Sequence, residues 1–472
     1  MESWFDHVML SRCQFALTTM FHITWAALSI GLSALLVVLE GWWLKTGEAL
    51  YYRHTRFWGK LFLLNFAVGA MSGLPLEFQF GTNWGPFAAA THGFFGNILG
   101  FETVVAFMLE AGFLGIMLFG WQRVSSRIHF FATCMVALGA SASAFWILVA
   151  NSWMQTPAGG YWDGARYVST SFWGSLLNPD MPWGVSHMWV ACLEATLFLV
   201  GGVSAWQILK NQHVDFYVRS LKIALMAAIL MAPLQIWLGD GSGRSVARTQ
   251  PTKLGAIESH WRTNPPGQGA PLKVLAWPDP AREDNAWTFI TIPAGLSLLT
   301  THSLTGQVKG LRDFPPEDRP PVAITFFAFR IMAGIGFLLF FLMVWTLWRW
   351  RKGMLTPERL WQQKWLLYAW VASIPLGFVA IETGWITREV GRQPWIIYGL
   401  LRTADGATPL PAATVASSLV AYSIVYTILF AALMIFGWRL INRGPDLASP
   451  PPPPGGGAGA AAPASQGDSP WK

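Results

Sequence analysis

The chain has 472 residues, of which 53% are hydrophobic and only 12% are charged, with 28 Trp and 32 Phe. Ordinary soluble domains carry roughly 25% charged residues, so this composition excludes a soluble globular protein. The net charge of +7 would suit a nucleic-acid partner, but the placement of the basic residues explains it without one. The three cysteines, Cys13, Cys134 and Cys192, form no CxxC or CxxCH motif. The sequence therefore shows no sign of a disulfide framework, a thiolate metal site or covalently attached haem.

Apolar runs of about 20 residues, the length that crosses a bilayer as a helix, recur along the chain. Helix is the expected conformation because backbone polar groups in lipid must be satisfied within their own segment. We therefore predict an all-α polytopic membrane protein with nine transmembrane helices. Their expected ranges are 15–41, 58–80, 94–120, 130–152, 184–208, 220–240, 322–348, 365–387 and 412–438. The amino terminus lacks a basic region followed by a small-residue cleavage site, so no removable signal peptide is expected.

The connections between these helices alternate in charge. Those after the first, third, fifth and seventh helices hold Lys45, Arg53, Arg56, Lys60, Arg123, Arg127, Lys210, Arg219, Arg349, Arg351, Lys352, Arg359 and Lys364. The connections after the second and fourth helices hold only Arg166. Because basic connections stay in the cytoplasm, we predict that the amino terminus lies outside and the carboxyl terminus lies in the cytoplasm.

One connection is long. Residues 241–321 join the sixth and seventh helices on the predicted outer side, and a loop of this length is usually functional. The chain then divides into helices one to six (1–240), this outer loop, helices seven to nine (322–443) and a tail (444–472). The tail contains PPPPP followed by GGGAGAAAPAS, a composition that predicts disorder in the cytoplasm.

Several ionisable or ligating side chains interrupt the apolar helices. A charged group in hydrocarbon costs several kcal/mol unless it is paired, protonated or bound to a cation, so these positions point to function. They are His22, Glu102, Glu110, His187, Glu194, Arg330, Met332 and Glu382. A helical rise of about 1.5 Å per residue places five of them at similar depth in the outer half of the membrane. Those five are His22, Glu102, His187, Met332 and Glu382. Glu110 lies about 12 Å deeper than Glu102, toward the cytoplasm.

Each residue also has a purely structural interpretation. A single intramembrane His is more often hydrogen-bonded to a neighbouring helix than a metal ligand, and Met332 alone would be core packing. Glu194 lies on nearly the same helix face as His187 and receives no role. Arg330 needs an acidic partner, which either a carboxylate or a haem propionate would supply.

Two classes of function fit these residues. One is a redox enzyme whose His, Met and Glu side chains bind haem iron. The other is a transporter with a polar site at the membrane midplane. A transporter would more naturally show Gly- or Pro-broken helices in matched halves, and the sequence shows no such pair. Haem absorption would separate the two classes.

Six motifs carry a resemblance that runs from SRCQFALTTMFH at Ser11 to about Arg443. They are FWGKLF (57–62), LEFQFGTNW (76–84), WILVANSWMQ (146–155), TKLGAIE (252–258), FAFRIM (327–332) and GRQPW (391–395). With these motifs the sequence closely resembles subunit I of the cytochrome bd-type quinol:oxygen oxidases. The outer loop lacks a long insertion before FAFRIM, as in the short-loop branch, which includes cyanide-insensitive oxidases.

The resemblance implies a role for each intramembrane ligand. The axial ligands of a low-spin haem b would be His187 and Met332. The pair of high-spin haems would be served by His22, Glu382 and Glu102. Two arginines, Arg330 and Arg392, would be haem-associated. The implied cofactors are two haem b and one haem d, although the third haem could instead be haem b. These assignments agree with the depths estimated from the helices.

The resemblance also implies the substrate path. Lys253 and Glu258 in the outer loop would bind quinol and help to deprotonate it, and Glu110 and Ser143 would lie on a proton path from the cytoplasm. The expected reaction is oxidation of ubiquinol or menaquinol at the outer face and reduction of dioxygen to water with cytoplasmic protons. It would generate a proton-motive force without pumping.

The implied setting is the bacterial cytoplasmic (inner) membrane. The implied partners are a second large membrane subunit, subunit II, and a small single-span accessory subunit. One departure is Phe378, which stands one helical turn before Glu382 where some relatives have Trp, so an electron-transfer role for that aromatic residue is not supported here. The alternative function is a quinol-linked haem b subunit that reduces an acceptor other than oxygen.

Overall fold

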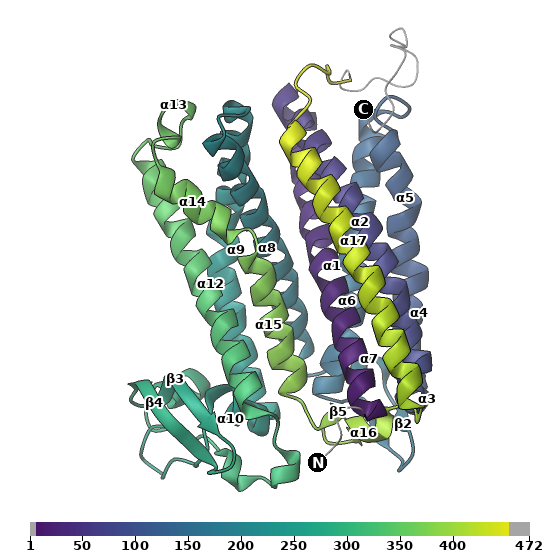
Figure 1. The fold of residues 1–472 in the computed structure, drawn as a ribbon, viewed down its shortest axis with the longest axis vertical. Helices are drawn as coiled ribbons and strands as arrows, with labels where there is room; N and C mark the ends of the chain where they lie inside the picture. Colours follow the sequence, from purple (N-terminus) through teal and green to yellow (C-terminus); the bar gives the residue numbers. More distant parts are fainter. Residues whose placement is uncertain (1–5, 453–472) are drawn as a thin grey trace.

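The computed structural model describes residues 6–452, and within that range nine helices are long and apolar enough to cross a membrane (Figure 1). Six of them are single helices: α1 (His7–Thr46), α2 (Ala49–Thr82), α6 (Ser126–Gln155), α8 (Met181–Leu209), α9 (Val214–Thr249) and α17 (Ala412–Arg443). The other three are built from shorter pieces and span Gly85–Phe119, Pro316–Arg351 and Lys364–Val390. The prediction of an all-α fold with nine spans is confirmed.

Two π-helical turns interrupt the α-helix of the third span. It runs through α3 (Gly85–Thr91), a π-helical turn (His92–Gly96), α4 (Asn97–Phe101), a second π-helical turn (Glu102–Phe107) and α5 (Met108–Phe119). Such π turns are rare and occur most often at functional sites. The second of them begins at Glu102, one of the predicted site residues.

The seventh and eighth spans are also composite. The long helix of the seventh is α12 (Val322–Arg351), which follows a short 3₁₀ turn. The eighth consists of α14 (Lys364–Ser373) and α15 (Leu376–Val390), with α13 (Pro357–Leu360) before it. The break at Ile374 and Pro375 is expected, since proline lacks the N–H group that continues the helical ladder.

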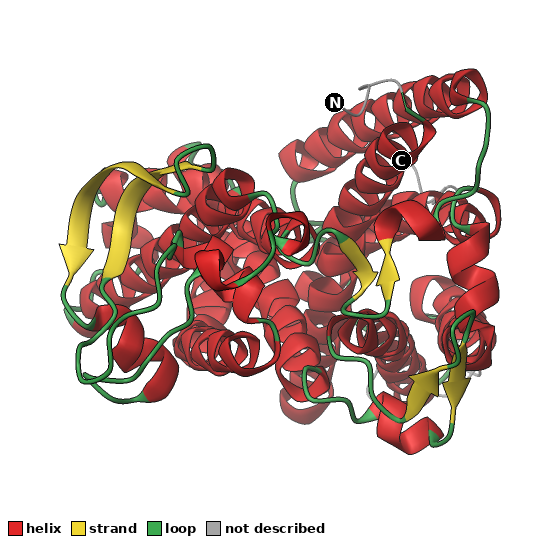
Figure 2. Ribbon diagram, turned by 90° about the horizontal axis from the view of Figure 1, so that it is seen from below, coloured by secondary structure: helices red, strands yellow, loops and turns green. Residues whose placement is uncertain are grey.

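The two ends of the bundle differ in their connections. We call the end that carries the hairpin of residues 272–292 the loop end and the opposite end the tail end. Three two-stranded sheets lie at the loop end, as Figure 2 shows. They pair β1 (Gly160–Trp162) with β2 (Tyr167–Ser169), β3 (Leu272–Asp279) with β4 (Asp284–Ile292), and β5 (Trp395–Ile397) with β6 (Leu401–Arg402). Two short helices, α7 (Phe172–Leu176) and α16 (Thr403–Gly406), complete these connections.

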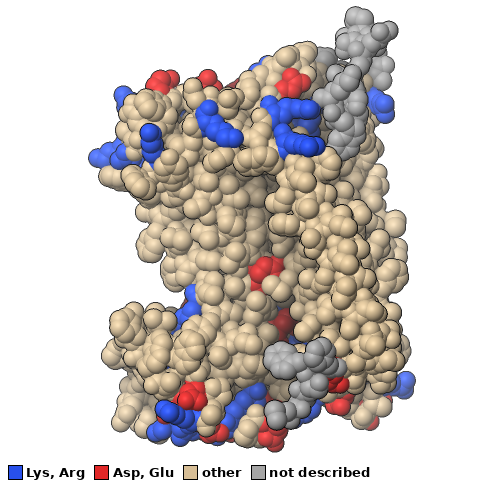
Figure 3. Space-filling view, in the orientation of Figure 1, with Lys and Arg blue, Asp and Glu red and all other residues tan. Residues whose placement is uncertain are grey.

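The first and last transmembrane helices reach opposite ends of the bundle: α1 begins at the loop end, and α17 finishes at the tail end (Figure 1). In the view of Figure 3 charged side chains of both signs gather at each end of the bundle, and the surface between the ends carries few of them. The side of the membrane that each end faces stays a prediction. Of the predicted tail 444–472, residues 453–472 lie outside the described residues.

The long connection is a folded unit. Helix α9 continues to Thr249, beyond the predicted end at Asp240, and an ion pair between Arg244 and Asp240 (3.0 Å) supports this extension. There follow α10 (Pro251–Glu258), the β3–β4 hairpin, α11 (Gly295–Thr301) and two 3₁₀ turns (Leu311–Asp313 and Pro316–Asp318).

The largest apolar core joins α1, α2, α8, α9, α12 and α14, and its bulkiest fully buried members include Trp58, Phe62, Phe198, Tyr217 and Trp370. Helix α8 packs against α9, α14 and α1, so it lies at the centre of the bundle. Lipid tails are as apolar as these side chains, so the helices are held together here mainly by close van der Waals packing. The polar residues described next are therefore held on well-packed helices.

Candidate functional site: a buried ligand set and a polar loop end

Glu382 lies on α15, where the helix passes α1. Its Oε1 atom accepts a hydrogen bond of 2.8 Å from the hydroxyl of Thr24. Its Oε2 atom is buried and has no hydrogen-bond partner among residues 6–452. A buried carboxylate oxygen without a partner is costly, and it offers a free lone pair to a cation.

His22 lies on α1, two residues before Thr24, and therefore at a depth similar to that of Glu382. Its Nδ1 atom is 3.1 Å from the hydroxyl of Ser72 and 3.2 Å from the carbonyl oxygen of Gly69, both on α2. Metal-binding histidines are commonly oriented by such a bond through one ring nitrogen. A Cβ atom at Gly73 would lie 3.0 Å from Cε1 of His22, so the glycine makes room for the ring.

His187 lies on α8 and faces α9. Its Nε2 atom is 3.4 Å from the amide nitrogen of Gln235, and its Nδ1 atom is buried with no partner in the described chain. A Cβ atom at Gly239 would lie 3.4 Å from the ring. Met332 on α12 reaches α15 instead, where a Cβ atom at Gly384 would lie 2.9 Å from its sulfur.

These residues suit a haem better than a bare metal ion. Within residues 6–452, no three His, Cys, Asp or Glu side chains gather as they would around a single ion. Instead, α1, α8, α12 and α15 each present one imidazole, thioether or carboxylate, and two of these groups carry an unpaired buried atom. Haem iron takes such single axial ligands because the porphyrin supplies the others. The residues present therefore fit haem.

A carboxyl cluster joins α2, the π turn and α6. Ser143 donates a hydrogen bond of 2.5 Å to Oε1 of Glu102. The hydroxyl of Thr103 lies within hydrogen-bond distance of both Glu77 (3.4 Å) and Glu102 (3.2 Å), so it links the two carboxyl groups. The structure thus brings Glu102 and Ser143 together, and it adds Glu77, which the sequence did not single out.

Glu110 is buried where α5 packs against α6. A Cβ atom at Gly139 would lie 2.8 Å from the Cβ of Glu110, so the two helices touch at this point. Farther toward the tail end, His129 bonds through Nδ1 to Glu40 (2.6 Å) and through Nε2 to the carbonyl of Met117 (2.9 Å). Because both ring nitrogens are bonded, this unpredicted pair fastens α1, α5 and α6 together.

Lys253 is buried at the loop end, although it lies in the long connection. Its Nζ atom donates a hydrogen bond of 2.5 Å to Oε1 of Gln155. The same oxygen accepts a second hydrogen bond, of 3.1 Å, from Nε2 of Gln250. Burial, together with the charges of Arg388 and Arg392, holds the pKa of Lys253 well below its usual range, despite the opposing charges of Glu389 and Asp180. The amine is therefore poised to exchange a proton or to bond a neutral polar ligand.

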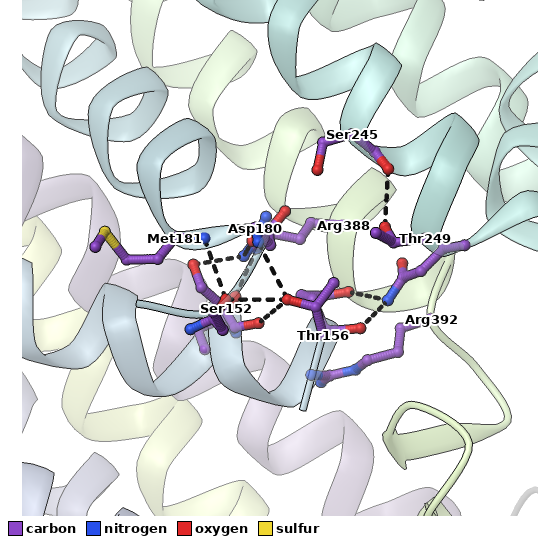
Figure 4. Close-up of polar contacts among 12 residues, drawn as sticks. Ser152, Thr156, Asp180, Met181, Ser245, Thr249, Arg388 and Arg392 are labelled. Carbon is purple, nitrogen blue, oxygen red and sulfur yellow. Dashed lines mark hydrogen bonds and ion pairs between the residues drawn. The ribbon is translucent and has the colours of Figure 1, made fainter. Parts of the chain in front are cut away.

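The last turn of α15 and the residues just after it supply a second part of this network (Figure 4). Arg388 donates 2.5 Å bonds to Asn151 and to the buried carboxylate of Asp180. Burial opposes ionisation of Asp180, but the facing Arg388 guanidinium holds the pKa of that carboxyl below its usual range. Arg392 pairs with Glu389, while its Nε and Nη1 atoms are buried with no partner in the part of the chain that the structure describes. These N–H groups fit an anion such as a haem propionate.

Glu258 and Arg330 form a buried ion pair between α10 and α12. The guanidinium donates three hydrogen bonds: one of 2.6 Å to the carboxylate of Glu258, one of 2.8 Å to the carbonyl of Lys273 and one of 3.1 Å to the carbonyl of Val274. The sequence left either a carboxylate or a haem propionate as the acidic partner of Arg330. In the structure the carboxylate of Glu258 takes this place. Lys253 contacts α6 whereas Glu258 contacts α12, so the two predicted quinol residues of α10 face different neighbours.

The fold and these side chains define a polytopic membrane protein whose buried side chains fit haem between its helices. The comparisons with known proteins agree. The family model described as cytochrome bd terminal oxidase subunit I matches residues 10–445. The cytochrome bd-II ubiquinol oxidase subunit 1 of Escherichia coli is 34% identical, over 93% of this chain and 97% of that protein. The cytochrome bd ubiquinol oxidase subunit 1 of Bacillus subtilis is 35% identical, over 93% of this chain and 95% of that protein.

A solved structure also matches. The bd oxidase of Geobacillus thermodenitrificans has a TM-score of 0.85 at 31% identity, covering 93% of this chain and 99% of that chain. The chain belongs to the family of cytochrome bd terminal oxidase subunit I. The resemblance found in the sequence is confirmed, and with it the classification of the chain as a quinol:dioxygen oxidoreductase of a respiratory chain.

Proposed function

We propose that this chain is the haem-carrying subunit of a terminal oxidase that oxidises a membrane quinol at the loop end and reduces dioxygen to water. The observation that carries the proposal is the set of buried ligand atoms without partners among the described residues, above all Oε2 of Glu382 and Nδ1 of His187. When bound, the haems supply the one-electron chemistry that links quinol to dioxygen.

We assign the haem positions as the resemblance implies. His187 and Met332 would hold the low-spin haem b, and His22, Glu382 and Glu102 would serve the high-spin pair, whose oxygen-binding member is haem d or a further haem b. Thr24 and Ser72 orient Glu382 and His22. Arg392 would pair with a propionate through its two unpartnered nitrogens. Arg330, held by Glu258, would lie beside the low-spin haem.

Quinol chemistry falls to two residues of α10. Lys253, whose lowered pKa favours the neutral amine, would bond a quinol oxygen. Glu258 would accept the quinol proton and release it at the loop end, and the Arg330 guanidinium holds its carboxylate in place for this exchange. We place the loop end on the outer side of the membrane, as the distribution of basic connections indicates.

The protons consumed with dioxygen would come from the tail end. Glu110 lies eight residues closer to that end than Glu102 along the same span, and Ser143 is bonded to Glu102. These three side chains would pass protons from the cytoplasm toward the ligand set. Taking protons from one side and releasing them on the other separates charge, worth about 2.3 kcal/mol per charge per 100 mV, without pumping.

The chain would act in a bacterial cytoplasmic (inner) membrane with ubiquinol or menaquinol. Relatives are named as a ubiquinol oxidase and, for a Bacillus subtilis protein 28% identical to this chain, a putative menaquinol oxidase. We propose a second large subunit as partner, and a small single-span accessory chain. The third span and α17 support this, because little of their apolar surface is buried within the chain.

Oxygen uptake by the purified complex, supplied with a reduced short-chain quinol, tests the function. We expect one dioxygen consumed per two quinols. Replacing Glu258 by Gln should lower this rate at least tenfold while the haem spectrum stays intact. The matched control is Glu283→Gln, a loop carboxylate that pairs with Arg319 (2.6 Å). A haem-loaded complex that consumes no oxygen would contradict the proposal.

A further inference from the structure

The β3–β4 hairpin exposes an unusual amount of apolar surface for a loop outside the helices. Its strands pair Trp277 with Trp287, whose rings stack at 6.2 Å between centroids. Its exposed large hydrophobic residues are Leu275 (39%), Trp277 (52%), Trp287 (48%), Phe289 (76%), Ile290 (45%) and Ile292 (49%). A contiguous exposed apolar patch usually marks a binding surface, and a long apolar edge strand such as β4 invites aggregation in water.

The hairpin lies beside the first turns of the membrane-spanning helix α12. Arg330 of α12 holds the backbone of β3 at Lys273 and Val274, and the ring of Trp277 lies 5.4 Å from that of Phe327, also on α12. Arg330 follows the first residue of α12, Val322, by eight positions, which is about 12 Å along the helix axis. The hairpin therefore runs alongside the first turns of α12, as Figure 1 shows.

The surface of α12 at this level is itself apolar and open. Ile324 is 54% exposed and Ile331 is 47% exposed. In Figure 3 this corner of the molecule projects from the bundle, and the surface above it is hollowed. The exposed face of the hairpin is thus continuous with the exposed face of a helix that crosses the membrane.

Apart from Lys273 in β3, whose Nζ atom donates a hydrogen bond of 2.9 Å to the carbonyl of Ser259, the charged residues of the hairpin lie at its turn. The turn holds Asp279, Arg282, Glu283 and Asp284, and its side chains pair with one another or with the rest of the connection. The pairs are Arg282 with Asp279 (3.3 Å), Arg319 with Glu283 (2.6 Å) and Arg262 with Asp284 (3.0 Å). Residues 286–292 of β4 carry no charge. The hairpin therefore has a polar tip, fastened to the connection, and an apolar body.

We propose that the β3–β4 hairpin is an interfacial membrane element, whose Leu275, Trp277, Trp287 and Phe289 lie in the lipid leaflet at the loop end. Tryptophan favours the boundary between headgroups and hydrocarbon, and the surface offers no charged group that would specify a protein partner. The leaflet would hold β3, and through its carbonyls the Arg330–Glu258 pair, at the level where a lipid-soluble molecule leaves the bilayer. The inference does not depend on the roles proposed for Lys253 and Glu258.

A spin label tests this placement. Phe289→Cys, in a full chain whose Cys13, Cys134 and Cys192 are replaced, puts the label on the apolar body. Arg282→Cys, at a side chain that is also 76% exposed, puts it on the tip as a matched control. In nanodiscs that contain the whole complex, we expect the label at 289 to be relaxed mainly by dissolved oxygen, which concentrates in lipid. The label at 282 should be relaxed mainly by a water-soluble nickel chelate.

Other outcomes overturn the proposal. Equal relaxation by the nickel chelate at both positions would place the hairpin in water, and a label at 289 that neither reagent reaches would mean that a protein covers the hairpin. A photo-crosslinking residue in place of Phe289, with the native cysteines kept, gives an independent measurement if the cysteine-free chain does not fold. Lipid adducts support the inference, and adducts to a protein subunit refute it.

Discussion

Gly384 gives the sharpest test of the proposed ligand set. A Cβ atom at this position would lie 2.9 Å from the sulfur of Met332, whereas nonbonded atoms normally approach to about 3.5–4.0 Å. In Gly384→Ala the thioether must therefore move by roughly 1 Å, about twice the displacement that a preorganised site tolerates. Overpacking of this kind costs about 1–3 kcal/mol, which would weaken iron binding by Met332 roughly five- to 160-fold.

The assay is the reduced-minus-oxidised spectrum of the purified complex, scaled to its total haem content. We expect Gly384→Ala to lose at least half of the low-spin haem b signal, and Met332→Leu to lose all of it. Gly115→Ala is the control, since its added Cβ would meet no atom of the described chain within 4 Å. An unchanged low-spin signal in Gly384→Ala, with Gly115→Ala also unchanged, would refute the placement of Met332 as a ligand.

Three further predictions concern other parts of the site. Thr24→Val removes the 2.8 Å bond to Glu382 and should cost about 1–3 kcal/mol, seen as lower high-spin haem content that Thr24→Ser restores. Glu110→Gln should slow oxygen reduction at least tenfold at normal haem content, and an unchanged turnover would rule out its proton role. The pKa of Lys253 is lowered by burial in the folded chain. The amine of Lys253 therefore binds a proton more tightly in the unfolded chain than in the folded one. That difference costs stability at every pH below about 10.4. Lys253→Met should therefore raise the unfolding temperature near pH 7, with a gain that shrinks toward pH 10–11; a lower unfolding temperature near pH 7 would contradict this.

The helices were predictable because lipid imposes one rule on every span: about 20 apolar residues with their backbone bonds satisfied internally. The exceptions are local. The end of α9 was predicted at Asp240 because the following residues are polar, but the Arg244–Asp240 pair and neighbouring contacts extend it to Thr249. The π turn that begins at Glu102 leaves no trace in apolar periodicity, since it changes the hydrogen-bond step and not the composition.

The site was predictable in part. Ionisable residues in hydrocarbon stand out one by one, which is how His22, His187 and Glu382 were found. Their partners do not stand out, because Thr24 and Ser72 are ordinary helix residues until the fold brings them near. Glu258 and Arg330 are 72 positions apart, so only the structure reveals their pair. Glu77 had a signal, a carboxylate within LEFQF, which an inspection of every motif for charge would have found.

The central claim is that buried side chains of this chain hold haem that carries electrons from quinol to dioxygen. One absorption measurement addresses it: the purified complex receives reduced quinol without air, and air is then admitted. We predict that reduced haem b bands appear with the quinol and disappear with the air, and a band in the red would identify haem d. A preparation without haem bands, or bands that persist in air while quinol is exhausted, would contradict the claim.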